Sequence, residues 1–473
     1  MTKNKNVDLC CFGFGCLFSI PFFIGYFIEN SGIMIFSLCL LLLVLLCKIF
    51  INKNFLCFLF LCIFVFFQMT RLILDFLNLS DLKWYRGYVG DYFDISVQKH
   101  ILLCFYLVLQ GLLLSLYTKV KNKNISLNSR YFLNDRLNIQ ISLVLSIFFL
   151  IPAVVQNLLA VKFVLTNGYF AYYKSFSPPY ILSVFSGMSY VFIYIYMSIS
   201  HKLSKVFLFF YIINFITSLL IGSRKDFVLY LLLMVFYFWN TRNNFSFKMI
   251  KKFFLPVVLL FSLLFFWGFA REGAISTISK YKINPLVLFL DTQGTSVVVP
   301  GYSKLYEDEI PNKGIAYLFP NQIRMVTNLL GTTIDKSDRK RDALEGFYIS
   351  KFISYKVLGD RFVVGEGLGG SFITDIYYCF SYGGVFFFSF LVGIFMKYCE
   401  KSRKNNLRYV IILSCVYNLL YIPRSQAFDI IIQITSIKFW VAILFYVFIN
   451  ELLRSIKRRN LNENCNNNYL LSK

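Results

Sequence analysis

The residues with the clearest chemical potential are three arginines at the ends of apolar segments. Arg224 stands in the polar turn 222–226 between two apolar runs, Arg271 follows a third run, and Arg424 lies in an Ile-Pro-Arg-Ser stretch near the C-terminus. A guanidinium can grip a phosphate through two parallel hydrogen bonds, which a lysine cannot reproduce. An arginine recessed at a membrane boundary is costly to hold without an anionic partner. The three arginines therefore predict a cationic pocket for a diphosphate, with catalytic roles for all three.

Each arginine also has a structural explanation. Asp226 could neutralise Arg224 within the turn, and Arg271 or Arg424 could be an anchor whose charged end reaches toward water. The pocket is favoured because the three lie at similar depth on the face where positive charge is otherwise disfavoured. Arg71 is a weaker fourth candidate, since Asp75 lies one helical turn further on and could pair with it.

Neighbouring polar residues extend the candidate site. Glu272 follows Arg271, and Asp375 lies inside an apolar run, where an acid is a functional candidate unless it simply pairs with an arginine. Either acid could orient or deprotonate a hydroxyl group. The other predicted substrate-binding residues flank Arg224, lie in a long polar segment, or belong to aromatic loops and a glycine-rich stretch: Ser223, Lys225, Arg324, Arg341, Arg361, Gly367, Gly369, Gly370, Tyr172 and Tyr173.

Several of these residues have simpler interpretations. The default role of Arg324, Arg341 and Arg361 is a solvated surface, and aromatic residues at this depth are more often an interfacial belt than a platform for sugars. The stretch 365–371 formally fits G-x-G-x-x-G, but no βαβ unit surrounds it, so a dinucleotide site is not expected. Glycines that let the backbone approach a helix or a ligand closely are the better explanation.

The elements that must position these residues are membrane-spanning helices. Of the 473 residues, 58% are hydrophobic and only 15% are charged. This composition excludes an ordinary soluble protein. Twelve runs approach the length of about 20 residues that a span requires. They lie at 9–28, 32–47, 55–74, 100–118, 138–160, 181–200, 206–221, 226–239, 253–270, 372–395, 409–422 and 430–450.

The charge distribution orients these spans. The net charge is +24, and nearly all of the excess falls on the connections that would be cytoplasmic if the N-terminus is cytoplasmic. The charge is therefore an orientation signal, and no nucleic-acid partner is needed. His100 and His201 fall on opposite faces in this topology, so we expect neither a zinc site nor any other metal or cofactor.

This topology divides the chain into four parts. Residues 1–270 form nine transmembrane helices with short loops, and 271–371 form a large, partly helical periplasmic loop. Residues 372–450 form three more helices, and 451–473 form a cytoplasmic tail that is expected to be disordered. The turn 222–226 is expected to lie below the outer membrane surface, because the runs around it are too short for two full crossings.

The local motifs resemble those of the Wzy-type O-antigen polymerases, also called oligosaccharide repeat unit polymerases. The resemblance rests on Gly-Ser-Arg at 222–224, the stretch from Gly367 through Asp375 to Gly384, and Pro-Arg-Ser at 423–425. The number of spans, the large late outer loop and the cytoplasmic termini are also similar. The sequence departs from the family pattern, in which a glutamate is more usual at the position of Asp375.

The resemblance implies an all-α polytopic protein of the GT-C type in the inner membrane. It would be a metal-independent glycosyltransferase whose donor and acceptor are both glycans linked to undecaprenyl diphosphate, with membrane lipid around it and a chain-length regulator as a possible protein partner. Arg224 and Arg271 would bind the diphosphates, and Arg424 the leaving oxygen or the acceptor. The alternatives are a lipid-linked oligosaccharide flippase and an O-antigen ligase. The large outer loop and the few charges inside the spans disfavour a flippase.

Overall fold

The computed structural model describes residues 12–80, 83–120, 130–168, 171–172, 175–221, 224–241, 284–331, 338–402 and 406–471. Within these ranges the chain is helical and forms no strand, and an isolated bridge pairs Arg86 with Tyr92. The predicted all-helical architecture is confirmed for this part of the chain.

Seven helices in the described ranges are long and apolar enough to cross a membrane. They are α3 (Ser31–Asn52), the continuous span Phe55–Phe76, α6 (Ile95–Tyr117), α7 (Arg136–Asn167), α9 (Tyr180–Ile199), α20 (Phe372–Glu400) and the part Ile437–Arg459 of α22 (Ile437–Leu471). The span Phe55–Phe76 comprises α4 (Phe55–Phe64), the π-helical turn η1 (Val65–Met69) and α5 (Thr70–Phe76). Each of the seven matches one of the runs predicted from the sequence.

Four further predicted spans correspond to shorter helices. They are Phe12–Phe27, which ends with α2 (Ser19–Phe27), then α10 (Lys205–Ile221), α11 (Arg224–Thr241) and α21 (Leu407–Leu419). At its length, α10 is shorter than the hydrocarbon thickness of about 30 Å. The predicted span 253–270 lies outside the described residues, so the total of twelve stays a prediction.

Helices α6 and α20 pack with their backbones in close contact. A Cβ atom on Gly111 would lie 2.5 Å from the carbonyl oxygen of Phe386, and one on Gly393 would lie 2.0 Å from Ser115 Oγ. Glycines permit this approach, as they do in other packed membrane helices. Where α6 ends, Lys397 Nζ of α20 donates to the carbonyl oxygens of Ser115 and Leu116 at 3.0 and 3.1 Å, and so adds a cationic donor to the carbonyl groups of the last turn of α6.

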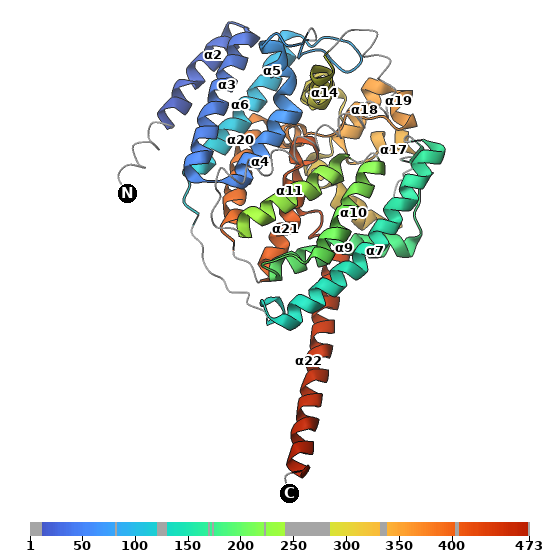
Figure 1. Cartoon of the computed structure of the whole chain (residues 1–473). Helices are drawn as coiled ribbons and strands as arrows, with labels where there is room; N and C mark the ends of the chain where they lie inside the picture. Colours follow the sequence, from blue (N-terminus) through green and yellow to red (C-terminus); the bar gives the residue numbers. More distant parts are fainter. Residues whose placement is uncertain are drawn as a thin grey trace.

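A second group of helices packs around α7, as Figure 1 shows on the side of the bundle away from α2 and α3. Phe149 of α7 stacks on Phe192 of α9, with ring centroids 4.3 Å apart. Asn157 of α7 donates to the side-chain oxygen of Asn214 in α10 at 3.0 Å. The polar bond between α7 and α10 gives their pairing a specificity that apolar packing alone would not provide.

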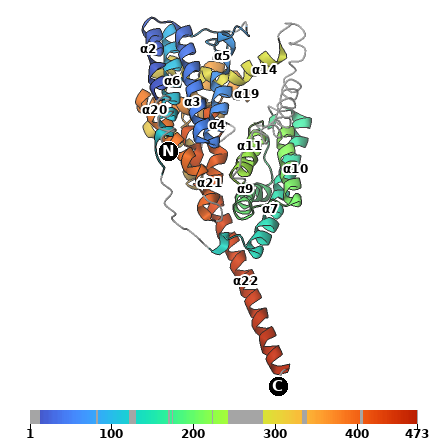
Figure 2. The ribbon, with the colours of Figure 1, turned by 60° about the vertical axis from the view of Figure 1, so that its left-hand side comes forward.

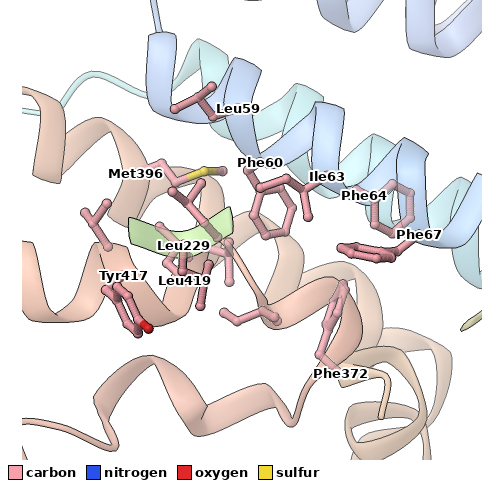
Figure 3. Close-up of a cluster of buried hydrophobic side chains, with 14 of the residues drawn as sticks. Leu59, Phe60, Ile63, Phe64, Phe67, Leu229, Phe372, Met396, Tyr417 and Leu419 are labelled. Atoms are coloured by element: carbon pink, nitrogen blue, oxygen red, sulfur yellow. The ribbon is translucent and has the colours of Figure 1, made fainter. Parts of the chain in front are cut away.

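The two groups meet in a buried apolar cluster, which Figure 3 shows in close-up. The side chains labelled in Figure 3 come from five elements, namely α4, η1, α11, α20 and α21. The labelled members are Leu59, Phe60, Ile63, Phe64, Phe67, Leu229, Phe372, Met396, Tyr417 and Leu419. Because α4 lies early in the sequence and α21 lies near its end, this cluster fixes the late helices against the early ones.

The described part of the long polar segment 271–371 folds into short helices. They are α14 (Pro285–Gln293), η3 (Gly294–Val297), α15 (Val298–Leu305), η4 (Glu307–Glu309), η5 (Gly314–Leu318), α16 (Pro320–Leu329), α17 (Arg339–Leu344), α18 (Ile349–Leu358) and α19 (Asp360–Val364). Figures 1 and 2 show α14 and α19 near one end of the bundle and the free end of α22 projecting from the other. Two short turns, η6 (Ile422–Arg424) and η7 (Ala427–Ile431), connect α21 to α22.

The C-terminal segment differs from its expected form. The sequence indicated a disordered tail at 451–473, whereas α22 continues to Leu471. The residues 451–471 contain neither glycine nor proline, so nothing in the covalent chain ends the helix.

Candidate functional site

Arg424 lies in the turn η6, directly after α21. Pro423 stands at the start of this turn, where its fixed φ suits a helical conformation and its missing N–H is not needed. The Arg424 guanidinium carbon lies 5.0 Å from the centroid of the Phe67 ring, and Nη1 donates to Gln293 Oε1 at 3.5 Å, a long and therefore weak bond. Across the described ranges, no carboxylate forms an ion pair with Arg424, so its charge is available to an anionic ligand.

The glycine-rich stretch brings its backbone against this turn. Gly369 has a φ of +87°, and a Cβ atom there would lie 3.7 Å from Arg424 Nε. A Cβ atom on Gly370 would lie 3.4 Å from backbone atoms of Ser425. Gly367 lies two residues before Gly369, and a Cβ atom there would lie 3.9 Å from Ser354 Oγ. The structure thus brings two of the motifs predicted from the sequence together, and their glycines keep the space beside Arg424 free of side chains.

Asp375 holds the chain just after the same turn through a hydrogen bond. It lies in the first turn of α20, is 2% exposed, and its Oδ2 accepts the backbone N–H of Ala427 at 3.1 Å. Ala427 is three residues after Arg424, so the carboxylate holds the chain that leaves η6. Within the described residues Asp375 forms no ion pair with an arginine. Its position is that of a residue that orients the loop carrying Arg424.

Gln68 is a contributor that the sequence analysis missed. It lies in η1, is fully buried, and its Nε2 donates both to the Pro423 carbonyl oxygen and, at 3.4 Å, to Ser371 Oγ. Its Oε1 has no hydrogen-bond partner in the part of the chain that the structure describes. Gln68 therefore ties the residue before Arg424 to the residue that precedes α20. A polar side chain inside the apolar run 55–74 was the signal that could have identified it.

Arg71 binds the polar segment rather than its own helix. Its Nη2 donates to Asp291 Oδ2 at 2.9 Å and its Nε to the Asp291 carbonyl oxygen at 3.0 Å. Burial raises the pKa of Asp291, and the nearby Arg71 charge opposes that shift. The possible pairing of Arg71 with Asp75 does not form: Asp75 instead accepts hydrogen bonds from Lys83 Nζ at 3.0 Å and from the Trp84 backbone N–H at 3.2 Å. The Arg71–Asp291 pair docks α14 on the bundle.

The start of α11 lies beside the same turn. Lys225 Nζ lies 4.6 Å from the centroid of the Tyr421 ring, three residues before Arg424. Burial raises the pKa of Asp429 in η7, and the Lys225 charge acts against that shift. Asn321 of α16 donates to Asp429 Oδ1 at 2.6 Å, which brings the polar segment to this point as well. The predicted motifs around residues 222–226 and 423–425 therefore converge.

The remaining predicted site residues fall into three groups. Arg224 begins α11, but its side chain, together with Ser223, Tyr173, Arg271 and Glu272, lies outside the described residues. Arg341 and Arg361 form ion pairs with carboxylates at 2.8 and 2.6 Å and are more than half exposed. The ring of Tyr172 packs 5.0 Å from that of Phe176 in its own segment.

Arg324 belongs to a small charged cluster in the polar segment. Its Nη1 lies 3.6 Å from Asp342 Oδ2, which also accepts a hydrogen bond from Lys351 Nζ at 2.6 Å. Burial lowers the pKa of Lys351, while Asp342 opposes the shift. Two cations thus share one carboxylate, and this arrangement gives Arg324 a structural partner that Arg424 lacks among the described residues.

Comparison with known proteins gives one family over nearly the full length of the chain. No curated protein and no solved structure matches it. The family model described as "O-antigen polysaccharide polymerase Wzy" matches residues 11–457 and confirms the resemblance seen in the motifs. With its seven span-length helices, the chain is a multi-pass membrane protein. It belongs to the O-antigen polysaccharide polymerase Wzy family.

Proposed function

We propose that this chain is an O-antigen polymerase that joins oligosaccharide repeat units carried on undecaprenyl diphosphate. The reaction takes place on the periplasmic face of the inner membrane, at the end of the bundle where α14 and α19 gather. The observation that carries the proposal is Arg424, a half-buried guanidinium without a carboxylate partner among the described residues, beside a backbone cleared by glycines.

The chemistry requires a site for a departing diphosphate. The acceptor hydroxyl oxygen forms a bond to the anomeric carbon of the donor glycan, and the bond from that carbon to the diphosphate oxygen breaks. Negative charge develops on the leaving undecaprenyl diphosphate, and the hydroxyl proton passes to a base. A preorganised cation such as Arg424 stabilises that charge without any metal ion.

The other proposed roles combine the sequence pattern with this geometry. On the sequence pattern, Arg224 and Arg271 bind the diphosphates, and Glu272 is the candidate to orient or deprotonate the acceptor hydroxyl. Asp375, whose oxygen is engaged by the Ala427 backbone, acts as a positioning residue for the loop that carries Arg424. Lys225, Gly369 and Gly370 lie beside this loop and contribute to substrate binding, as Ser223 does on the sequence pattern.

Lipopolysaccharide banding after deletion of the gene tests the function itself. Loss of a polymerase leaves lipid A core carrying one repeat unit, whereas loss of the alternative activities, a flippase or an O-antigen ligase, leaves bare core. A bare-core band would therefore refute the proposal. The experiment needs complementation with the intact chain to show that the band pattern depends on this protein.

Substitution of Arg424 tests the role of the guanidinium. We expect Arg424→Gln to reduce polymerisation by about 10²–10³, the effect of removing one preorganised donor to a developing anion. Arg424→Lys keeps the charge but loses the planar fork, so we expect chains that are clearly shortened. The matched control is Arg130→Lys, which alters an exposed arginine that pairs with Glu451 at the other end of the bundle. Full-length chains from Arg424→Lys at normal abundance would remove the bidentate role.

A further inference from the structure

A basic cavity lies at the end of the bundle from which α22 projects, and Arg424 is not among the residues that line it. Figure 2 shows the start of α7 beside α22 at the level where α22 leaves the other helices. The cavity between these two elements has a volume of about 340 Å³. Its lining residues are Asp135, Arg136, Leu137, Arg454, Lys457 and Arg458.

The cavity has more cations than its own carboxylate can neutralise. Arg454 Nη2 donates to Asp135 Oδ2 at 2.8 Å and to Asn138 Oδ1 at 3.0 Å, so the Asp135 charge is already used. Asp135 also caps α7 by accepting the Asn138 backbone N–H at 2.7 Å. The remaining cations, Arg136, Lys457 and Arg458, form no ion pair within the residues that the structure describes. Such an arrangement attracts an anion.

The surroundings of the cavity favour an anion that is attached to a lipid. The candidate span Ile437–Arg459 ends at this cavity, and Arg454, Lys457 and Arg458 belong to its last two turns. Basic residues at the end of a span lie at the level of the lipid headgroups, where they attract anionic lipids. Leu137 adds an apolar wall to the cavity itself. A lipid whose phosphate group enters the cavity can keep its acyl chains in the adjoining hydrocarbon layer, and a soluble phosphate has no such anchor.

We propose that this cavity binds the phosphate group of an anionic phospholipid from the cytoplasmic leaflet. In the proposed topology this end of the bundle faces that leaflet, and basic pockets between helices on that side bind anionic headgroups. Arg136 comes from the start of α7, while Lys457 and Arg458 come from α22. The lipid thus bridges two elements and holds the last span against the helix group around α7.

Native mass spectrometry of the purified full-length chain tests the proposal. The protein in detergent micelles is titrated with phosphatidylglycerol, with phosphatidylcholine as the zwitterionic comparison. The test variant is Lys457→Gln/Arg458→Gln, and the matched control is Lys202→Gln/Lys205→Gln, which removes the same charge from another connection. Both pairs are exposed, and neither forms an ion pair among the described residues.

We expect phosphatidylglycerol to bind the test variant about 30-fold more weakly than the unaltered chain, since each basic group near an anionic lipid contributes a factor of about 5. The control should bind as the unaltered chain does, and Lys457→Arg should retain binding. The proposal would be overturned if the unaltered chain bound phosphatidylcholine as well as phosphatidylglycerol, or if the control variant lost as much binding as the test variant. It would also be overturned if inorganic phosphate, at the same concentration as the lipid, displaced all of the bound phosphatidylglycerol. Matching helical circular dichroism of the variants shows that any loss is not unfolding.

Discussion

Gln68 offers the sharpest test of how the loop that carries Arg424 is held. We predict that Gln68→Leu leaves stability nearly unchanged but reduces polymerisation by up to about 10²-fold. The substitution leaves the buried Pro423 carbonyl oxygen without its donor, which costs about 1–3 kcal/mol. It also removes the fully buried Oε1, which has no partner in the described ranges, and so regains a similar amount. The two terms nearly cancel, so stability hardly moves.

The rate of polymerisation should nevertheless fall, because the two changes that cancel in stability do not both affect the position of Arg424. Without the amide, the turn η6 loses its link to the span Phe55–Phe76, and a displacement of about 1 Å at Arg424 can cost about 10²-fold in rate. Polymerisation of lipid-linked repeat units by the purified protein should show a lower kcat with little change in KM, because the donor glycan still reaches the site. Thermal unfolding in detergent gives the stability of each variant.

The matched control for this prediction is Gln110→Leu in α6. Gln110 is an amide in another span, and its Nε2 donates to Ser19 Oγ at 2.9 Å, away from the polar segment. We expect its removal to leave the kcat unchanged. Normal polymerisation by Gln68→Leu at normal abundance would refute the positioning role. A fall in kcat that is matched by an equal loss of stability would refute it too, because it would indicate general misfolding.

Two further predictions concern the same region. Gly369→Ala should lower the unfolding temperature and shorten the chains, because a side chain at a φ of +87° costs about 1–3 kcal/mol. Gly370→Ala adds the same methyl group at an ordinary 3.4 Å contact and should be tolerated, so equal effects of the two substitutions would contradict this reasoning. Burial raises the pKa of Asp429 above its ordinary value of 3.8, so the unfolded chain loses this proton first and stability should fall as pH rises from about 4 through the folded-state pKa. Asp429→Asn should flatten that part of the unfolding-temperature profile, and an unchanged slope would exclude Asp429 as its source.

Hydropathy predicted the long helices because lipid imposes a simple condition on them. A span must be apolar over most of its length to cross the hydrocarbon layer, and this condition is visible in each of the seven runs that the structure forms as one long helix. The same condition says little about α21, whose 13 residues are mostly buried among other helices. It also gave no sign that α22 would continue past residue 451, since that segment leaves the apolar region.

Residue type alone was enough to select candidate residues, but it did not give their partners. Arg424 and the glycines at 369 and 370 were selected because a boundary arginine and a glycine cluster are unusual in themselves, and the structure brings them side by side. Asp75 was considered as a partner for Arg71 because local spacing was the only available guide, whereas the partner in the structure, Asp291, is 220 residues further along the chain. No local pattern contains that information, because it depends on how the polar segment folds back on the helices.

The π-helical turn Val65–Met69 sets how far the side chains of α5 are rotated about the helix axis relative to those of α4. Each residue advances an α-helix by about 100°, and a π turn absorbs one additional residue without unwinding its neighbours. On one side of this turn, Phe60 and Phe64 point into the central apolar cluster; after it, Arg71 meets Asp291. If the same residues formed a regular α-helix without the π turn, these two faces would turn apart by about 100°. The bilayer would still accept that apolar helix, but the protein could no longer satisfy both contacts at once.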